Sequence, residues 1–254
     1  MSKKLPILPR TNKNRLILYG KHPVFAAIAN PKRQINKILT IADNADELKK
    51  ACSKTKRSPS IVTIVDRKEI DKILPLDTVH QGVIAYSQEL ECYNIDEICQ
   101  IADNIDNCHI LILDQVTDPQ NIGAIIRSCV AFNTLALVVQ DKNSPTETGA
   151  MAKTSAGMIE HLPIVRVTNI VQAIKQLKKH GFWVIGMDGY AKNTIDNLKK
   201  GGKNAIIMGS EGKGMRRLVE ESCDITVKLP LNTKVESLNV ATAAAITLYE
   251  INKQ

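Results

Sequence analysis

The spacing of apolar positions along this chain switches repeatedly between the short runs typical of strands and the three-to-four-residue spacing typical of helices. In the N-terminal third this pattern predicts a compact α/β module that begins near residue 16 and ends near residue 88. The expected strands cover residues 35–41, 61–65 and 82–86, and the expected helices cover residues 22–30, 45–56 and a short stretch opened by Asp66.

A second alternating set of strands and helices occupies residues 108–254. The expected strands cover residues 109–114, 135–140, 162–167, 182–187, 205–208 and 225–229, and the expected helices cover 118–132, 170–180, 215–221 and 237–252. Such alternation predicts a mostly parallel sheet covered by helices on both faces. Ligands bind such sheets at the carboxyl ends of the strands, so we expect a site in the loops after Asp114, Met187, Met208 and Leu229.

The composition is that of an ordinary globular protein, with 44% hydrophobic and 24% charged residues among 254. No apolar run approaches the roughly 20 residues that span a bilayer, and the N-terminus lacks the apolar core of a secretory signal. The six cysteines form no Cys-x-x-Cys pair and do not cluster with the five histidines. We therefore expect a cytoplasmic protein with reduced thiols, no membrane partner and no metal site.

Charge is distributed unevenly along the chain. Residues 1–72 hold 17 Lys and Arg against 6 Asp and Glu, a balance of +11, whereas residues 73–107 hold seven acids and no Lys or Arg. This pattern predicts a mobile basic arm over residues 1–15, a polyanion-binding domain over 16–88 and an acidic linker over 89–107, in which residues 93–104 are expected to form a connector helix. The alternative is a solvated basic surface that binds no ligand.

The segment 118–132 opens as a well-signalled helix, with Asp118 as N-cap and Pro119 at the first helical position. A glycine inside a helix costs about 1 kcal/mol relative to alanine, so close approach by another backbone or by a ligand would explain Gly123. Arg127 falls on the side of the helix opposite the apolar stripe. Taken alone, it could be an exposed arginine on an ordinary amphipathic helix.

Two further segments combine a strand, a polar loop and a helix. Residues 205–215 run from an apolar strand into a loop with Gly209, Gly212 and Gly214, which matches neither common phosphate-loop pattern and so disfavours a nucleotide-dependent enzyme. Residues 229–246 carry the polar run Glu-Ser-Leu-Asn before a helix that is rich in alanine, and we expect Ser237 and Asn239 to cap that helix.

In this order, Asn-x-Gly-x-x-x-Arg, Met-Gly-Ser-Glu-Gly-x-Gly-Met and Leu-Pro-Leu followed by Glu-Ser-Leu-Asn-Val resemble the three motifs of the SpoU (TrmH/RlmB) family of the SPOUT superfamily. Members are S-adenosylmethionine-dependent RNA ribose 2'-O-methyltransferases. The likeness covers residues 109–252 almost continuously. Residues 20–24 and 80–83 resemble the family's small substrate-binding domain, which is similar to ribosomal protein L30e.

Among subfamilies the RlmB type is the most similar, which implies methylation of a guanosine in 23S ribosomal RNA. A tRNA methyltransferase of the same family is one alternative, and a non-catalytic RNA-binding or ribosome-assembly protein is another. The resemblance also implies a deep trefoil knot in the catalytic domain over residues 108–254, a homodimer, and S-adenosylhomocysteine as the second product.

The resemblance assigns roles to individual residues. The catalytic positions are Asn121, Arg127, Glu211, Ser237 and Asn239. The methyl-donor positions are Met187, Gly189, Met208, Gly209, Leu229, Leu231 and Leu238. In the N-terminal module we take Lys21, His22, Lys32 and Arg33 as candidate RNA contacts. Because aromatic residues make up only 4% of the chain, phosphate and shape contacts should dominate RNA binding.

The chemistry of the implied reaction constrains the role of Arg127. Arginine side chains stay protonated in proteins, so an arginine is a poor general base. We expect Arg127 to stabilise the developing ribose alkoxide and to hold the flanking phosphate, while a phosphate oxygen or water takes the proton.

Overall fold

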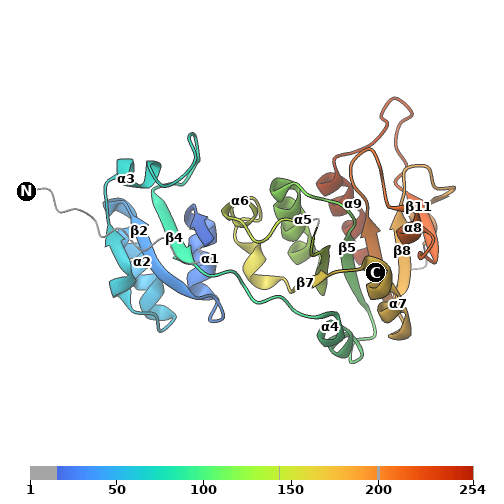
Figure 1. Ribbon diagram of the computed structural model, residues 1–254, viewed down its shortest axis with the longest axis horizontal. Helices are drawn as coiled ribbons and strands as arrows, with labels where there is room; N and C mark the ends of the chain where they lie inside the picture. The colour runs from blue at the N-terminus through green and yellow to red at the C-terminus, as the bar shows by residue number, and fades with distance from the viewer. Residues whose placement is uncertain (1–15, 143, 199–200, 254) are drawn as a thin grey trace, which may run out of the picture. The chain divides into compact units, whose positions relative to one another are not determined.

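The computed structural model describes residues 16–142, 144–198 and 201–253 (Figure 1). The chain divides after Leu90 into two compact units. The expected basic arm, residues 1–15, lies outside the described residues. Among the residues that the structure describes, none of the helices combines the length and the apolar composition needed to cross a membrane.

The first unit is a four-stranded mixed sheet with helices packed on it. The strand order is β1 (Leu16–Tyr19), β4 (Val83–Ser87), β2 (Ile35–Thr40) and β3 (Val62–Ile64), in which only β2 and β3 pair in parallel. The helices are α1 (Lys21–Ala29), α2 (Ala42–Lys54) and α3 (Arg67–Asp71), with a 3₁₀ turn at Pro59–Ile61. The sequence analysis did not predict β1.

The second unit contains a seven-stranded sheet in which every pair of neighbours is parallel, which confirms the expected α/β class. The strand order is β7 (Ile164–Val167), β6 (Ala136–Gln140), β5 (Cys108–Leu113), β10 (Lys203–Met208), β8 (Trp183–Met187), β11 (Ile225–Lys228) and β9 (Asn193–Thr194). The central pair, β5 and β10, joins strands that are far apart in the sequence.

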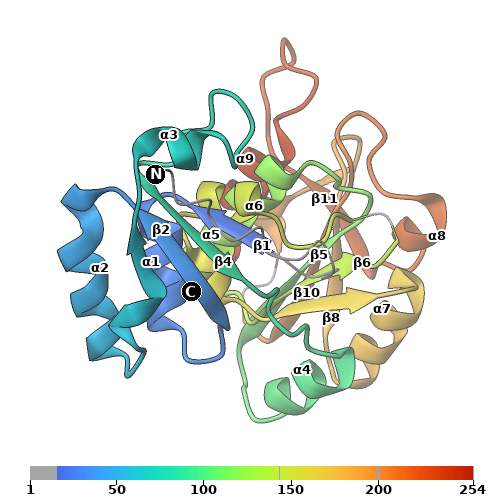
Figure 2. The same cartoon turned by 60° about the vertical axis from the view of Figure 1, so that its left-hand side comes forward.

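Helices cover both faces of this sheet (Figure 2). They are α4 (Ile95–Ala102), α5 (Pro119–Ala131), α6 (Gly149–Thr154), α7 (Ile170–Lys179), α8 (Arg217–Glu220) and α9 (Val240–Asn252), with 3₁₀ turns at Met158–His161 and Ile195–Asn197. α5 packs against both α6 and α9, whereas α4 packs against α7.

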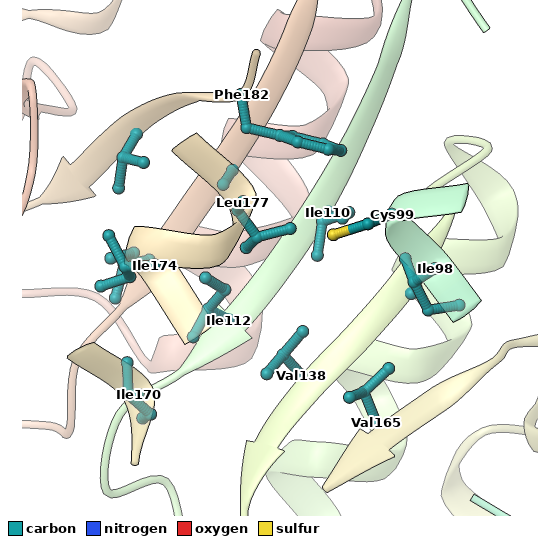
Figure 3. Packing of buried hydrophobic residues seen from close by; sticks show 14 of the residues in the cluster. Ile98, Cys99, Ile110, Ile112, Val138, Val165, Ile170, Ile174, Leu177 and Phe182 are labelled. Atoms are coloured by element: carbon teal, nitrogen blue, oxygen red, sulfur yellow. The ribbon is translucent and has the colours of Figure 1, made fainter. Parts of the chain in front are cut away.

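One side of the sheet forms a continuous apolar core with α4 and α7 (Figure 3). Ile110 and Ile112 of β5 and Val138 of β6 point toward Cys99 of α4 and Ile174 of α7, and all five are fully buried. Side chains alternate between the two faces of a strand, so Leu111 and Leu113, which are also fully buried, face the other layer. Burial on both faces explains why β5 reads as an uninterrupted apolar run.

The segment 89–107, which the charge pattern indicates as an acidic linker, contributes a helix to the second unit. In α4, a capping box joins Asn94 and Glu97, whose side chains each accept a hydrogen bond from the other's backbone. Its apolar face, with Ile98 and Cys99, lies in the core described above. The acidic residues therefore form the outer face of a packed helix.

Three elements of the second unit differ from the sequence-based expectation, and one of them is the two-residue strand β9, which was not predicted. The short helix α6 was not predicted; it is only six residues long and is capped by Thr148, whose hydroxyl accepts a hydrogen bond from the Met151 amide. The last helix begins at Val240 rather than near Ser237, because Asn239 is its N-cap.

Candidate active site

The first turn of α5 is fixed by its capping residue. The Asp118 carboxylate accepts hydrogen bonds from the amides of Gln120, at 3.1 Å, and Asn121, at 3.3 Å. Pro119 occupies the first helical position, where no donor is lost. This cap confirms the predicted helix start and sets the position of Asn121 on the first turn.

Gly123 lets a second backbone approach α5 closely. A Cβ at this position would lie 2.8 Å from the Met151 carbonyl oxygen and 2.8 Å from Cβ of Thr154. Of the two explanations that the sequence left open, close approach by another backbone is therefore the one found, and the approaching element is α6 of the same chain.

The glycine-rich loop after β10 is folded back on itself. The Ser210 amide donates to the Gly214 carbonyl at 3.1 Å, and the Gly214 amide donates to the Ser210 carbonyl at 2.9 Å. A Cβ on Gly209 would lie 2.2 Å from the Gly214 carbonyl carbon, so no larger residue fits where the loop closes. This closure places Glu211 at the tip of the loop.

The three sequence motifs meet at one oxygen atom, Oε1 of Glu211. It accepts hydrogen bonds from Nδ2 of Asn121 at 3.3 Å, from Nδ2 of Asn239 at 2.8 Å and from the Val240 amide at 3.1 Å. Asn239 Nδ2 also donates to Oδ1 of Asn121 at 2.9 Å. Glu211 is thus joined to Asn239, 28 positions away, and to Asn121, 90 positions away, in one polar cluster. We call it the Asn121–Glu211–Asn239 cluster.

Asn239 also organises the last helix. Its Oδ1 accepts hydrogen bonds from the amides of Ala241 at 3.0 Å and Thr242 at 3.3 Å. Ser237 was expected to share this capping role, and that expectation is wrong, because Ser237 is exposed and lies outside the first turn of α9.

Arg127 lies on the exposed side of α5, one helical turn beyond Gly123. Within the part of the chain that the structure describes, its guanidinium makes no hydrogen bond and no ion pair. A free guanidinium has all five donors available for a phosphate or a ribose oxygen.

The expected methyl-donor residues follow the carboxyl ends of adjacent parallel strands. Met208, the last residue of β10, lies opposite Met187, the last residue of β8. Gly209 and Gly189 follow these strands, and Gly189 has open space where a Cβ would stand. After β11, which pairs with β8, come Leu229, Leu231 and, just before the N-cap of α9, Leu238.

This arrangement combines buried apolar groups, exposed apolar groups and loop backbone at one sheet edge. Met187 and Met208 are buried, whereas Leu231 is 40% exposed although it is a large apolar residue. A ligand with apolar and polar parts, such as a nucleoside joined to an amino acid, fits such an edge.

One contact at this edge went unnoticed in the sequence. Asp114, which directly follows β5, is fully buried and accepts hydrogen bonds from the amide and the guanidinium of Arg216. The sequence did contain a signal for this contact, because Asp114 directly follows an apolar strand. A carboxylate that is buried at the end of such a strand requires a partner.

The four RNA-contact candidates of the first unit do not lie together. Lys21 and His22 begin α1, whereas Lys32 and Arg33 follow its end, and a nine-residue helix is about 13 Å long. Arg33 is only 1% exposed, and its Nη1 donates to the Gln88 carbonyl at 2.7 Å. The prediction that Arg33 contacts RNA is therefore wrong, because its guanidinium is used inside the fold.

The titration of the thiols argues against a cysteine nucleophile. Burial raises the pKa of Cys129 to about 12 and that of Cys223 to about 12. The reactive form of cysteine is the thiolate, so neither thiol is activated. Within residues 16–142, 144–198 and 201–253, no three His, Cys, Asp or Glu side chains group closely enough to hold a metal ion.

Two family models match this chain. One, described as the SpoU rRNA Methylase family, matches residues 109–249. The chain belongs to the SpoU rRNA Methylase family. The second model, described as RNA 2'-O ribose methyltransferase substrate binding, matches residues 17–92. The Asn121–Glu211–Asn239 cluster therefore lies within the SpoU methylase match, and the first unit coincides with the substrate-binding match.

Several known proteins are similar to this chain over nearly its whole length. The 23S rRNA (guanosine-2'-O-)-methyltransferase RlmB of Pasteurella multocida is 34% identical over 239 residues, which are 93% of this chain and 97% of that protein. The putative TrmH family tRNA/rRNA methyltransferase YacO of Bacillus subtilis is 33% identical over 92% of this chain and 94% of its own.

Solved structures show the same fold. The SpoU methyltransferase AviRb of Streptomyces viridochromogenes, in complex with AdoMet, has a TM-score of 0.78 at 21% identity and covers 95% of this chain and 90% of its own. The AdoMet-bound rRNA methyltransferase of Sinorhizobium meliloti has a TM-score of 0.78 at 19% identity and covers 94% of this chain and 87% of its own.

Proposed function

We propose that this protein transfers a methyl group from S-adenosylmethionine to the ribose 2'-oxygen of a guanosine in 23S ribosomal RNA, in the cytoplasm. The observation that carries the proposal is the convergence of three distant motifs on Oε1 of Glu211, beside the carboxyl ends of β8 and β10. The family supplies the reaction class and the RlmB relatives supply the substrate.

The tRNA alternative is not favoured. The RlmB relative of Haemophilus influenzae is 35% identical over 93% of this chain and 97% of its own length. A purely RNA-binding role is not favoured either, because the polar cluster of the catalytic motifs is intact.

The donor fits the edge formed by β8, β10 and β11. We assign its binding to Met187, Gly189, Met208, Gly209, Leu229, Leu231 and Leu238, whose backbone and apolar groups follow the ends of these strands. When bound there, the donor supplies an electrophilic methyl group. The closed Ser210–Gly214 loop holds its amides in fixed positions before any ligand arrives.

On the RNA side, Arg127 is the residue that we assign to the reacting ribose. Its free guanidinium can donate to the developing alkoxide and to the flanking phosphate at the same time. The ribose proton passes to a phosphate oxygen or to water, since arginine stays protonated. Asn121, Glu211 and Asn239 hold the start of α5, the donor loop and the start of α9 in register, and the exposed Ser237 borders the ribose site.

The family resemblance supports three further parts of the proposal. The C-terminal segment is threaded through a loop of the chain and so forms a deep trefoil knot. Two copies of the chain pair as a homodimer through helices near the site. The first unit, residues 16–90, binds the RNA, for which Lys21, His22 and Lys32 remain our candidates.

Substitution of Arg127 tests the assignment. Arg127→Ala should bind S-adenosylmethionine as the wild type does, yet lose at least about a hundredfold in methylation rate, in keeping with the loss of a transition-state donor. Calorimetry gives the donor affinity, and mass spectrometry of nucleosides from 23S ribosomal RNA gives the methylation.

A control variant separates this effect from a general loss of charge. Arg217→Ala removes an exposed arginine that forms an ion pair with Glu221, the residue after α8, and it should methylate normally. Near wild-type methylation by Arg127→Ala would refute the role. Arg127→Lys distinguishes a two-pronged contact from simple charge, because lysine restores only the charge.

A further inference from the structure

We propose that Asp114 is a positioning residue that fixes both ends of the donor-binding loop and thereby sets the place of Glu211. The inference rests on the proposed function, because it assigns the loop after β10 to the methyl donor. Asp114 itself is fully buried and its carboxylate is engaged by Arg216, so it acts through the residues it holds.

The side chain of Asp114 holds the C-terminal end of the loop. Its Oδ2 accepts a hydrogen bond from the Arg216 amide at 2.8 Å, and its Oδ1 accepts from Nε at 2.8 Å and lies 2.7 Å from Nη2 of the same residue. Both carboxylate oxygens are thus engaged by one residue, through its backbone and its side chain together.

The backbone of Asp114 holds the N-terminal end of the same loop. Its amide donates to the Met208 carbonyl at 2.8 Å, which continues the pairing of β5 with β10 by one residue. Met208 and Arg216 are therefore both hydrogen-bonded to Asp114, which belongs to a different segment of the chain. The loop between them, 209–215, starts and ends at fixed points.

The closed loop transmits this anchoring to the polar cluster. Between the anchors, the mutual hydrogen bonds of Ser210 and Gly214 leave Glu211 at the loop tip. A shift of Arg216 would move Gly214, which packs against Gly209, where a Cβ would have only 2.2 Å. Any movement of the loop therefore displaces both Glu211 and the backbone that we assign to donor binding.

Asp114→Asn tests the idea because the substitution keeps the size of the side chain and removes one acceptor. Both oxygens of Asp114 face donors of Arg216, so an asparagine points its NH₂ group at a donor whichever way the amide turns. We expect the dissociation constant for S-adenosylmethionine to rise by about tenfold or more, since small displacements of binding groups have large effects.

Asp224 provides a matched control in the same unit. It too accepts from a backbone amide, that of Val184 at 2.8 Å, and from a cation, Lys178 Nζ at 2.6 Å. It lies at the opposite, amino-terminal end of β8 and β11. Asp224→Asn should lower the melting temperature but leave donor affinity within about twofold of the wild type.

A second readout needs no ligand. Hydrogen exchange of the Ser210 and Gly214 amides should be faster by about tenfold in Asp114→Asn and unchanged in Asp224→Asn, because only the first releases the loop. Failure of the wild type to bind S-adenosylmethionine would refute the proposed function, while the exchange measurement would still decide the role of Asp114.

The proposal is overturned if Asp114→Asn matches Asp224→Asn in both donor affinity and amide exchange. Should Asp114→Asn fail to fold, Arg216→Lys decides by the same two measurements. Lysine keeps the positive charge beside the buried carboxylate but has one nitrogen in place of Nε and Nη2. Wild-type donor affinity and wild-type exchange in Arg216→Lys would equally overturn it.

Discussion

Oε1 of Glu211 joins two helices of the second unit through one side chain. Its three donors belong to the first turn of α5 and to the first residues of α9. Hydrogen bonds to a charged carboxylate oxygen are stronger than those to a neutral amide oxygen. One glutamate side chain can therefore hold both helices. Arg127 contributes differently: its donors stay free within the described structure and so remain available to a substrate.

His109 makes stability depend on pH. Its ring lies 3.1 Å from the Thr134 hydroxyl through Nε2, and burial lowers the pKa of the imidazole, partly offset by a hydrogen bond with Phe132. The unfolded chain, with an ordinary histidine near pH 6.5, then binds more protons than the folded one below that pH. Stability is therefore fully present above about pH 6.5 and falls as the pH drops.

The free energy of unfolding, measured by chemical denaturation between pH 5 and pH 8, tests this effect. The wild type should lose more stability on acidification than His109→Gln, which cannot take up the proton. Parallel curves for the two proteins would show that burial of His109 does not contribute to acid sensitivity.

At the scale of elements, the packing of α5 against α6 decides which residue stands at position 123. Alanine would favour the helix by about 1 kcal/mol. Its Cβ, however, would press against the Met151 carbonyl oxygen at 2.8 Å, and overpacking of this kind typically costs about 1–3 kcal/mol. We expect the steric term to prevail, because the opposing atom is backbone and cannot rotate away.

Gly123→Ala should therefore lower the free energy of unfolding by about 1 kcal/mol, which denaturant titration measures directly. Ala124→Gly, at the next position of α5, is the control and should cost about 1 kcal/mol through helix propensity alone. A Gly123→Ala protein more stable than the wild type would show that α6 yields to the added methyl group.

Periodicity predicted most strands and helices of both units, because their apolar faces are long enough to show a repeat. It missed β1, β9 and α6. The start of α9 was misplaced by a plausible cap at Ser237, since two capping residues stand close together and only the structure selects Asn239.

The candidate site was predictable to the extent that its motifs resemble a known family. Asn121, Glu211 and Asn239 follow from that resemblance, and the structure joins them. The contact of Asp114 with Arg216 spans 102 positions and depends on the pairing of β5 with β10, which no local pattern reveals.

At the scale of the whole molecule, the uneven charge predicts that RNA binding is sensitive to salt. The net charge is +8, and the excess of cations lies in residues 1–72. Binding of RNA phosphates releases counterions, so the logarithm of the affinity should fall linearly with the logarithm of salt concentration. The scarcity of aromatic residues leaves few stacking contacts to weaken that dependence.

Lys21→Gln should reduce the magnitude of that slope by about 1 if the side chain contacts a phosphate. Filter binding of 23S ribosomal RNA fragments over a range of salt concentrations measures it. Lys175→Gln removes the same charge from an exposed position of α7 in the second unit and should leave the slope unchanged. Equal slopes for wild type and Lys21→Gln would exclude Lys21 from the RNA surface.

The strand order has a consequence for the newly made chain. Within the second unit, β5, β6 and β7 are synthesised first, whereas β10, which lies between β5 and β8 in the finished sheet, begins only at Lys203. At ordinary synthesis rates β5 therefore waits about 5 to 20 s with one edge unpaired. Its residues Ile110–Leu113 are all fully buried in the final fold. An open apolar edge of this kind pairs readily with other chains, so the nascent protein is exposed to aggregation during this interval.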